Sequence, residues 1–235
     1  MRGYLFNGKH NYNDIGLIME SKSIQPPAKK KIKVDVPGMN GFYDFSTVGS
    51  NGEIIYTERS IKVIHGLPAR NKVDLYVLYS KALEWLQDVG KCQLIFDDIS
   101  YFYFMAEVEG ISTFQEMVTF GKLEVTFTCE PFKTGLNFVG STIWDTFNFN
   151  EDILQDYSYD VVATEAVNVN IYNPGRLVTP TINCSVPMTV VFAGKIYPLI
   201  AGDNVPYGMK LLNGNNTLVI NGTGHIAVLF RKVIL

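Results

Sequence analysis

The sequence predicts a mainly β protein with two domains and one helix. Three observations support this: apolar and polar residues alternate along most of the chain, a segment near residues 71–89 has helical spacing, and the composition changes after Pro131. Alternation places successive side chains on opposite faces of a strand, whereas apolar residues on one helix face recur every three or four positions. A length of 235 residues permits one large domain or two smaller ones, since a domain usually takes roughly 100–200 residues.

The composition indicates a folded protein whose surface is partly covered. Apolar residues make up 47% of the chain, including 15 Phe and 13 Tyr, which is enough for a core and excludes disorder. Charged residues make up 18%, compared with about 25% in a typical soluble domain, so we infer that partners cover part of the surface. The 20 basic and 23 acidic residues give a net charge of −3, which does not favour nucleic-acid binding.

Five strands are predicted before Pro131. Residues 31–36 alternate between apolar and charged side chains before a turn at 37–41, and residues 52–64 are rich in β-formers. The run from Tyr101 to Val108 is apolar or aromatic at nearly every position, which predicts a strand covered by the core on one face and by another layer or subunit on the other. Residues 113–119 and 123–129 predict a hairpin with its turn or bulge at Phe120-Gly121-Lys122.

The predicted helix lies between Pro68 and Gly90, which are typical of a helix entry and a helix stop. Its apolar residues recur at helical spacing and form one broad stripe. The stripe contains Val73, Tyr76, Val77, Leu83 and Leu86, with Tyr79, Ala82 and Trp85 between them.

A domain boundary is predicted near residues 132–140, where the sequence becomes glycine-bearing and aperiodic, so the expected domains are 1–133 and 134–235. Short strands with tight turns between them then predict an antiparallel β-sandwich. The predicted strands are 159–171, 179–186, 188–193, 195–200, 207–212, 217–220 and 225–231, with turn signals that include Gly202-Asp203-Asn204.

Catalytic and metal-binding patterns are absent from the sequence. His10, His65 and His225 stand in separate segments without a second ligand at metal-binding spacing. Asp97-Asp98 has two interpretations, a cation or acid–base site and a turn between strands, of which we favour the turn. No nucleotide-binding or hydrolase motif is present, so no cofactor, no metal and no enzymatic activity are expected.

The cysteines and the N-terminus indicate synthesis in a reducing compartment. The chain has three cysteines, Cys92, Cys129 and Cys184. Because their number is odd and they are far apart in the sequence, we predict free, buried thiols rather than disulfides. The start MRGYLFNGKH has no apolar stretch that would predict a secretory signal, and no segment predicts a membrane span.

Two further clusters have alternative interpretations. Lys29-Lys30-Lys31 and Lys33 follow a pair of prolines and fit either a nucleic-acid contact or a solvated arm, and we favour the arm. Trp144, with Phe138, Phe147 and Phe149 nearby, fits sugar stacking or packing in a core or interface, and we favour packing.

The order of several short segments resembles the distal tail protein (Dit) family of long, non-contractile-tailed bacteriophages and prophages. The resemblance covers nearly the whole chain. The segments are Tyr4-Leu-Phe-Asn-Gly, Val36-Pro-Gly-Met-Asn-Gly, Ala82-Leu-Glu-Trp-Leu, Leu94-Ile-Phe-Asp-Asp, Tyr101-Phe-Tyr-Phe-Met-Ala, Val125-Thr-Phe-Thr-Cys-Glu-Pro-Phe, Asn173-Pro-Gly and Leu211-Leu-Asn-Gly-Asn-Asn-Thr-Leu.

The resemblance implies a structural hub of the tail tip or baseplate. The N-terminal domain would assemble into a hexameric ring that continues the tail tube and leaves a channel for DNA, without specific DNA binding or membrane contact. A galectin-like C-terminal sandwich would point outward and carry a receptor-binding or other baseplate component. The implied partners are further copies of the chain, the tail-associated protein, the tape-measure protein and the tube protein, and the implied location is the virion tail tip after synthesis in the host cytoplasm.

We expect the ring to form by strand-edge pairing and burial of aromatic side chains. One alternative is a carbohydrate- or receptor-binding sandwich that uses Trp144 or Tyr207, although His225-Ile-Ala-Val-Leu-Phe-Arg lacks the Asn of the galectin sugar-binding strand. Another is a cell-wall hydrolase that pairs Asp97 or Asp98 with a distant acid. The candidate interface residues are Tyr101, Phe102, Tyr103, Phe104, Phe114 and Met117.

Overall fold

The computed structural model describes residues 3–48, 53–117, 120–140, 148–149, 152–162 and 166–235. The chain forms two compact units, residues 1–133 with Leu235 (unit 1) and residues 134–234 (unit 2). Both units consist mainly of strands, and the described residues contain one α-helix. The predicted mainly β fold with one helix is confirmed.

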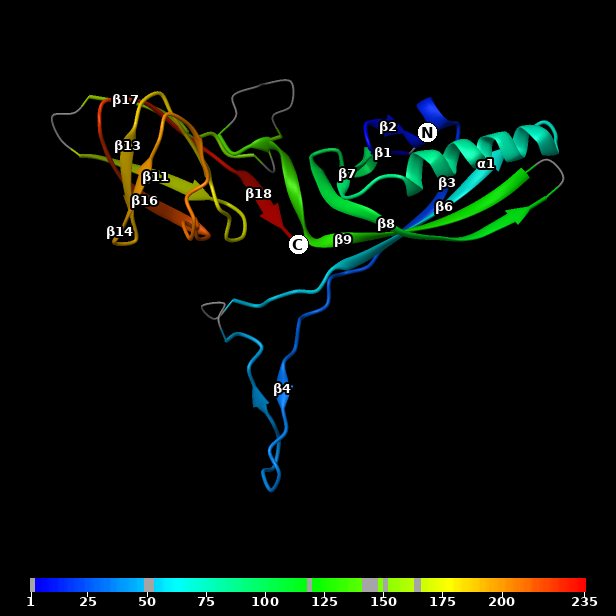
Figure 1. Ribbon diagram of the computed structural model, residues 1–235, viewed down its shortest axis with the longest axis horizontal. Helices are drawn as coiled ribbons and strands as arrows, with labels where there is room; N and C mark the ends of the chain where they lie inside the picture. The colour runs from blue at the N-terminus through cyan, green and yellow to red at the C-terminus, as the bar shows by residue number, and fades with distance from the viewer. Residues whose placement is uncertain (1–2, 49–52, 118–119, 141–147, 150–151, 163–165) are drawn as a thin grey trace. The chain divides into compact units, whose positions relative to one another are not determined.

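Unit 1 is built on an antiparallel sheet with the strand order β2-β1-β7-β8-β9-β6-β3 (Figure 1). The strands are β1 (Tyr4–Phe6), β2 (Lys9–His10), β3 (Ile18–Ile24), β6 (Arg59–Pro68), β7 (Cys92–Phe96), β8 (Phe102–Glu116) and β9 (Phe120–Phe138). β8 and β9 form the predicted hairpin, but its turn is not at 120–122. Phe120 and Gly121 already pair with Pro68 and Leu67 of β6, because the long strand β6 continues the ladder that far.

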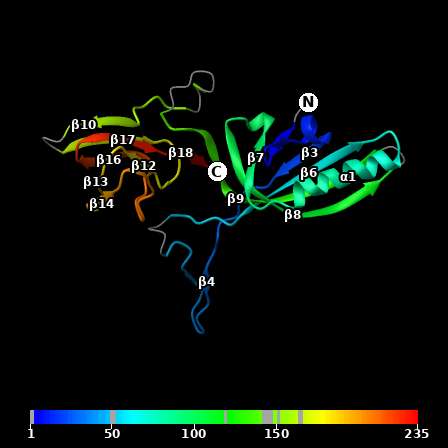
Figure 2. The ribbon, with the colours of Figure 1, turned by 45° about the horizontal axis from the view of Figure 1, so that its top comes forward.

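Helix α1 (Lys72–Gln87) lies along the sheet of unit 1 (Figure 2). Asn71 caps its N-terminus by accepting a hydrogen bond from the Asp74 N–H at 2.9 Å. The helix buries Leu75, Ala82, Trp85 and Leu86, whose spacing of three, four or seven residues matches one helix face. The helix predicted at about 71–89 is therefore observed.

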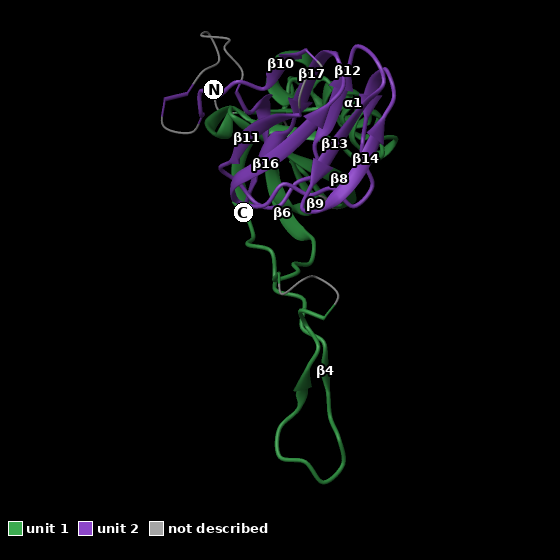
Figure 3. Ribbon diagram, turned by 90° about the vertical axis from the view of Figure 1, so that its left-hand side faces the viewer, with its two compact units in different colours: residues 1–133, 235 green, residues 134–234 purple. Residues whose placement is uncertain are grey.

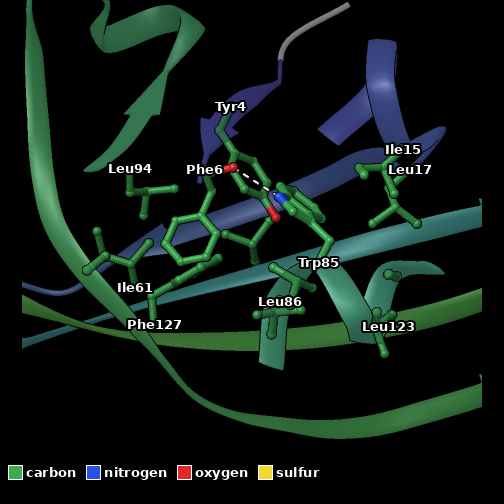
Figure 4. Packing of buried hydrophobic residues seen from close by; sticks show 14 of the residues in the cluster. Tyr4, Phe6, Ile15, Leu17, Ile61, Trp85, Leu86, Leu94, Leu123 and Phe127 are labelled. Atoms are coloured by element: carbon green, nitrogen blue, oxygen red, sulfur yellow. Dashed lines mark hydrogen bonds between the residues drawn. The ribbon is translucent and has the colours of Figure 1, made fainter. Parts of the chain in front are cut away.

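Aromatic rings form the centre of the unit 1 core (Figure 4). The Trp85 ring stacks on Tyr4 with centroids 5.7 Å apart, and Phe6 meets Phe127 edge to face at 5.2 Å. The Trp85 Nε1–H donates a hydrogen bond to the Phe6 carbonyl at 2.9 Å, so the buried indole is satisfied. Cys129 belongs to the same core. The three cysteines are free, as predicted, and Cys129 and Cys184 are buried, but Cys92 is only partly buried.

A histidine is buried beside these rings. The His65 Nε2 and the Tyr4 hydroxyl are 2.8 Å apart, whereas the His65 Nδ1 has no hydrogen-bond partner. Burial lowers the pKa of His65 to about 4, since desolvation disfavours the charged imidazolium. His65 is therefore neutral in the folded protein at neutral pH.

Between β3 and β6 the chain forms a thin hairpin that projects from the rest of unit 1 (Figure 3). We call its described residues, 25–48 and 53–58, the arm. Its paired strands are β4 (Lys33–Val34) and β5 (Tyr43–Asp44), and a bridge between Lys29 and Tyr56 and single backbone hydrogen bonds also connect its two sides. The predicted strand at 31–36 is thus reduced to two paired residues. Several large apolar side chains of the arm are exposed, namely Ile32, Val34, Val36, Phe42, Tyr43 and Phe45.

Unit 2 contains two four-stranded antiparallel sheets, in the orders β10-β17-β12-β15 and β11-β16-β13-β14, whose inward side chains share one core. This is a β-sandwich. The predicted turn at 202–204 is strand β15, and the predicted strand at 207–212 makes a single bridge, Val178 to Leu211. The strands are β10 (Ser158–Val161), β11 (Val167–Asn173), β12 (Thr181–Cys184), β13 (Met188–Phe192), β14 (Lys195–Leu199), β15 (Gly202–Asn204), β16 (Gly214–Asn221) and β17 (Gly224–Leu229).

The last strand, β18 (Arg231–Ile234), pairs with β9. Within unit 2, the Arg231 guanidinium donates a hydrogen bond to the Gly135 carbonyl at 3.2 Å and lies 4.3 Å from the Phe138 ring centroid. A cation over an aromatic face is stabilising. The start and the end of unit 2 are thus held together.

Unfolding experiments at acidic pH test the state of His65. The folded pKa of about 4 lies below the unfolded value of about 6.5, so the unfolded state takes up the proton first as the pH falls. We expect His65 to remove about 3 kcal/mol from the free energy of unfolding between pH 7 and pH 4. Urea unfolding at both pH values measures the loss, and the variant Tyr4→Phe/His65→Leu should lose correspondingly less. An equal loss in the variant would contradict the assignment.

Candidate assembly surfaces

The candidate interface residues on β8 are divided between the two faces of the sheet. Phe104 is 2% exposed and belongs to the unit 1 core, and Phe102 is also buried. Tyr103 is half-buried on the opposite face, and Tyr101, just before the strand, is 48% exposed. Because side chains alternate along a strand, the aromatic residues 101–104 are divided between the two faces. Tyr101 and Tyr103 are the two that a second chain can contact directly.

The remaining two candidates lie near the β8–β9 turn. The half-buried Phe114 ring stacks on Tyr79 of α1, with centroids 4.1 Å apart and an interplanar angle of 14°. Met117 is exposed, and its N–H donates a hydrogen bond to the Phe120 carbonyl at 2.8 Å. Phe114 therefore supports the helix, whereas Met117 is accessible to a partner.

The outward side of α1 exposes large apolar side chains. Val73 is 72% exposed, Val77 is 63% exposed and Tyr76 is 49% exposed. They belong to the apolar stripe of the sequence, but they face away from the core, in which Leu75, Ala82, Trp85 and Leu86 are buried. They line a shallow groove, which we call the α1 outer face; its residues are Lys72, Val73, Tyr76, Val77, Ser80, Lys81 and Glu84.

A small polar network supports one end of the α1 outer face. The Tyr76 hydroxyl donates to Glu116 Oε2 at 2.9 Å, and Lys72 Nζ lies 2.8 Å from Glu116 Oε1. The hydrogen bonds from Lys72 and Tyr76 lower the pKa of Glu116, so the carboxylate stays charged and holds both partners. The Tyr76 ring is therefore kept in place at the surface.

The sheet face opposite α1 carries more acidic than basic side chains among those named below. Lys62 forms an ion pair with Glu124 at 2.6 Å, and Lys122 forms one with Glu20 at 3.0 Å. According to strand alternation, the same face of β8 and β9 adds three glutamates that form no ion pair with a lysine among the described residues. These are Glu107, Glu109 and Glu130, of which Glu109 accepts a hydrogen bond from Thr128.

In unit 2 a serine, a histidine and an aspartate form a hydrogen-bonded chain that sequence reasoning missed. Ser158 Oγ lies 3.1 Å from His225 Nε2, and Asp160 Oδ1 lies 2.8 Å from His225 Nδ1. The atoms follow the order of a Ser-His-Asp triad, but the acid of such a triad is buried, whereas the Asp160 side chain is 88% exposed. Cross-strand pairing of β10 with β17 explains the contact, which no local spacing reveals.

Asp97, Asp98 and His10 make hydrogen bonds and ion pairs within unit 1. Asp97 accepts a hydrogen bond from the Gly3 N–H at 2.7 Å and lies 3.3 Å from His10 Nε2, and Asp98 pairs with Lys22. The short helical turn Asp97–Ile99 connects β7 to β8, as the turn interpretation predicts. Within the described ranges, no three His, Cys, Asp or Glu side chains come together in a way that would hold a metal ion.

Two other predictions concern membranes and sugars. Among the described residues, no helix combines the length and apolar character needed to cross a bilayer. Trp144 and Phe147, proposed as alternatives for sugar stacking, lie outside the described residues. Tyr207, the other aromatic of that alternative, is 100% exposed.

A family model described as the phage tail protein RIFT-related domain matches residues 10–129. The match covers just over half of the 235 residues and includes β3, the arm, β6, α1, β7 and β8. The chain belongs to this family of phage tail proteins. Its predicted location in the virion tail is therefore confirmed.

Solved structures resemble the tail protein over its whole length. The crystal structure of the SPP1 Dit protein (gp 19.1), described as a paradigm of the hub adsorption apparatus in phages that infect Gram-positive bacteria, matches with a TM-score of 0.70 and 14% identity over 100% of both chains. The phage P2 baseplate in its activated conformation with Ca gives a TM-score of 0.45 and 8% identity over 99% of this chain and 98% of that chain. The comparison with curated proteins found no match. The tail protein thus has the fold of a distal tail protein, as its sequence predicts.

Substitutions on the two sides of α1 should change the stability of the isolated tail protein by very different amounts. Val77→Asp changes an exposed side chain and should alter the free energy of unfolding by less than about 0.5 kcal/mol. Trp85→Ala removes a buried ring and its hydrogen bond and should cost about 3–5 kcal/mol. Urea unfolding of dilute protein measures both. A large loss in Val77→Asp would show that the α1 outer face is part of the core.

Proposed function

We propose that the protein is the distal tail hub, a structural protein that closes into a hexameric ring and joins the tail tube to the components of the tail tip. The observation that carries this proposal is the match to SPP1 Dit over 100% of both chains, together with the tail protein domain at 10–129. That relative is described as a hub of the adsorption apparatus. In this role the protein needs neither a cofactor nor a catalytic group.

The surface of unit 1 supports self-association. A ring is closed by a head-to-tail contact, in which two different patches of the same chain meet. Unit 1 offers exposed apolar patches on the arm and on the α1 outer face, and it exposes Tyr101 and Met117. Large apolar side chains of this kind mark protein interfaces.

The acidic face of the sheet supports a channel for DNA. Duplex DNA carries one negative charge per about 1.7 Å, and basic walls would retain it. On the face opposite α1, Lys62 and Lys122 are both paired, and Glu107, Glu109 and Glu130 add negative charge. We assign this face to the channel, where DNA would pass without specific binding.

The remaining partners follow from the position of a hub. The tube and tape-measure proteins would meet one side of the ring, and the tail-associated or tail-tip protein would meet the other. The sandwich of unit 2 would carry a receptor-binding or other outer component. We also propose that this sandwich has the galectin-like topology that the family resemblance implies.

Solution mass and microscopy test the hub directly. We expect the purified protein, alone or after addition of its tail-tube neighbour, to form a ring with six times the 26.4 kDa mass of one chain. Light scattering coupled to gel filtration measures the mass, and negative-stain images should show a toroid with outward lobes. A monodisperse monomer under both conditions would contradict the proposal.

A carbohydrate- or receptor-binding sandwich is the second candidate, and one observation favours it. Tyr207 is fully exposed, and Ile200 and Val205 nearby in the chain are also exposed. An exposed aromatic ring is a common stacking surface for a ligand. If this candidate is correct, Tyr207→Ala should reduce binding to a glycan array or to host cells by about tenfold or more, whereas Tyr172→Ala, at another exposed tyrosine of unit 2, should not. A wild-type protein that binds no glycan and no host cell would exclude it.

A further inference from the structure

The arm is a two-stranded hairpin with little stability of its own. Its paired strands are two residues long each, and a two-stranded hairpin is marginally stable at best in water. Ile32, Val34 and Val36 on one strand are each more than 40% exposed, and so are Tyr43 and Phe45 on the other. This length of apolar surface requires a second surface to cover it.

The α1 outer face has matching chemistry in two parts. Its first part is apolar, at Val73 and Val77. Its second part contains Glu84, and Asp88 lies one turn beyond the face at the end of the helix; neither carboxylate has an ion pair or hydrogen bond within the described part of the chain. Lys81 on the same face donates a hydrogen bond to the Asp14 carbonyl at 2.8 Å. The last turn contains no basic residue, although the negative end of a helix dipole favours cations. A basic group from another chain would reduce the repulsion between these carboxylates and the negative end of the helix dipole.

The arm presents the complementary order of residues. Lys29 and Lys30 come first, and their side chains form no ion pair among the described residues. The apolar residues Ile32, Val34 and Val36 follow toward the tip. Lys31 and Lys33 are already engaged, by Asp44 and by the Phe42 ring. The arm therefore has two unpaired lysines followed by an apolar edge. This order complements the two unpaired carboxylates and the apolar groove of α1.

The lengths of the two surfaces also agree. Six residues of strand from Lys30 to Val36 span roughly 20 Å at about 3.3 Å per residue. Eleven residues of helix from Val77 to Asp88 span roughly 16 Å at about 1.5 Å per residue. When the tip of the arm covers Val73 and Val77, its lysines thus reach the acidic end of α1.

We propose that the arm of one copy of this chain seats on the α1 outer face of a neighbouring copy. Val34 and Val36 cover the apolar groove, and Lys29 and Lys30 pair with Glu84 and Asp88. The inference rests on the proposed ring, which needs two different complementary patches in each chain. The arm and the α1 outer face supply such a pair within unit 1, so the contact repeats around the ring.

A charge exchange in the full-length protein tests the polar half of the contact. Lys29→Glu/Lys30→Glu and Glu84→Lys/Asp88→Lys should each raise the concentration needed for ring assembly about tenfold. All four substitutions together should restore assembly to within about threefold of the wild type. As a matched control, Glu107→Lys/Glu130→Lys adds the same charge to the sheet face and should not rescue the arm variant. Mass photometry across a dilution series measures assembly.

Cysteine pairing tests the apolar half. Val34→Cys protein mixed with Val77→Cys protein and oxidised should give a disulfide-linked dimer, and Val34→Cys mixed with Tyr103→Cys should not. Wild-type rings without this crosslink and without charge rescue would overturn the arm contact and leave the hub proposal intact. Crosslinking of the arm to a different tail protein would overturn it as well. A wild-type protein that forms no ring would overturn both proposals.

Discussion

The rotation of α1 about its own axis is the constraint on which the surfaces of unit 1 depend. Trp85 sets it, because its indole donates to the Phe6 carbonyl and stacks on Tyr4 in the middle of the core. Once this residue is fixed, the helical repeat of 3.6 residues determines which other residues face the sheet. Val73 and Val77 then point outward. The second side of this helix therefore exposes apolar side chains, as the proposed assembly surface requires.

The same separation of faces governs the sheet. Along β8, Phe102 and Phe104 point toward the helix and the core, and Tyr103 points to the other face. The core side accepts even a histidine, but only in its neutral form and beside the Tyr4 hydroxyl. The other side keeps its charges, with lysines neutralised by glutamates. One sheet therefore holds the helix and also presents a face suited to a channel.

The described residues include one hydrogen-bonded chain that resembles a catalytic site. The Ser158–His225–Asp160 chain has the bonds of a catalytic triad, yet its exposed acid lacks the buried setting that would orient the imidazole for catalysis. The low charge content of the sequence fits a protein that is covered by copies and partners. Family membership and a shared fold with SPP1 Dit agree with an assembly role.

Local sequence patterns were sufficient for the mainly β fold, the place of the helix, the turn at Asp97 and Asp98, the free cysteines and the family, because periodicity, turn residues and short motifs act over a few positions. They failed for the turn near residue 120 and for β15, where pairing with a distant strand extends the ladder. They also did not determine the buried side of α1. Two overlapping apolar stripes were available along that helix, and a hydrogen bond between residues 79 positions apart selects one of them. Such long-range contacts exist only after the chain has folded, so the outward face of α1 is a property of the tertiary structure.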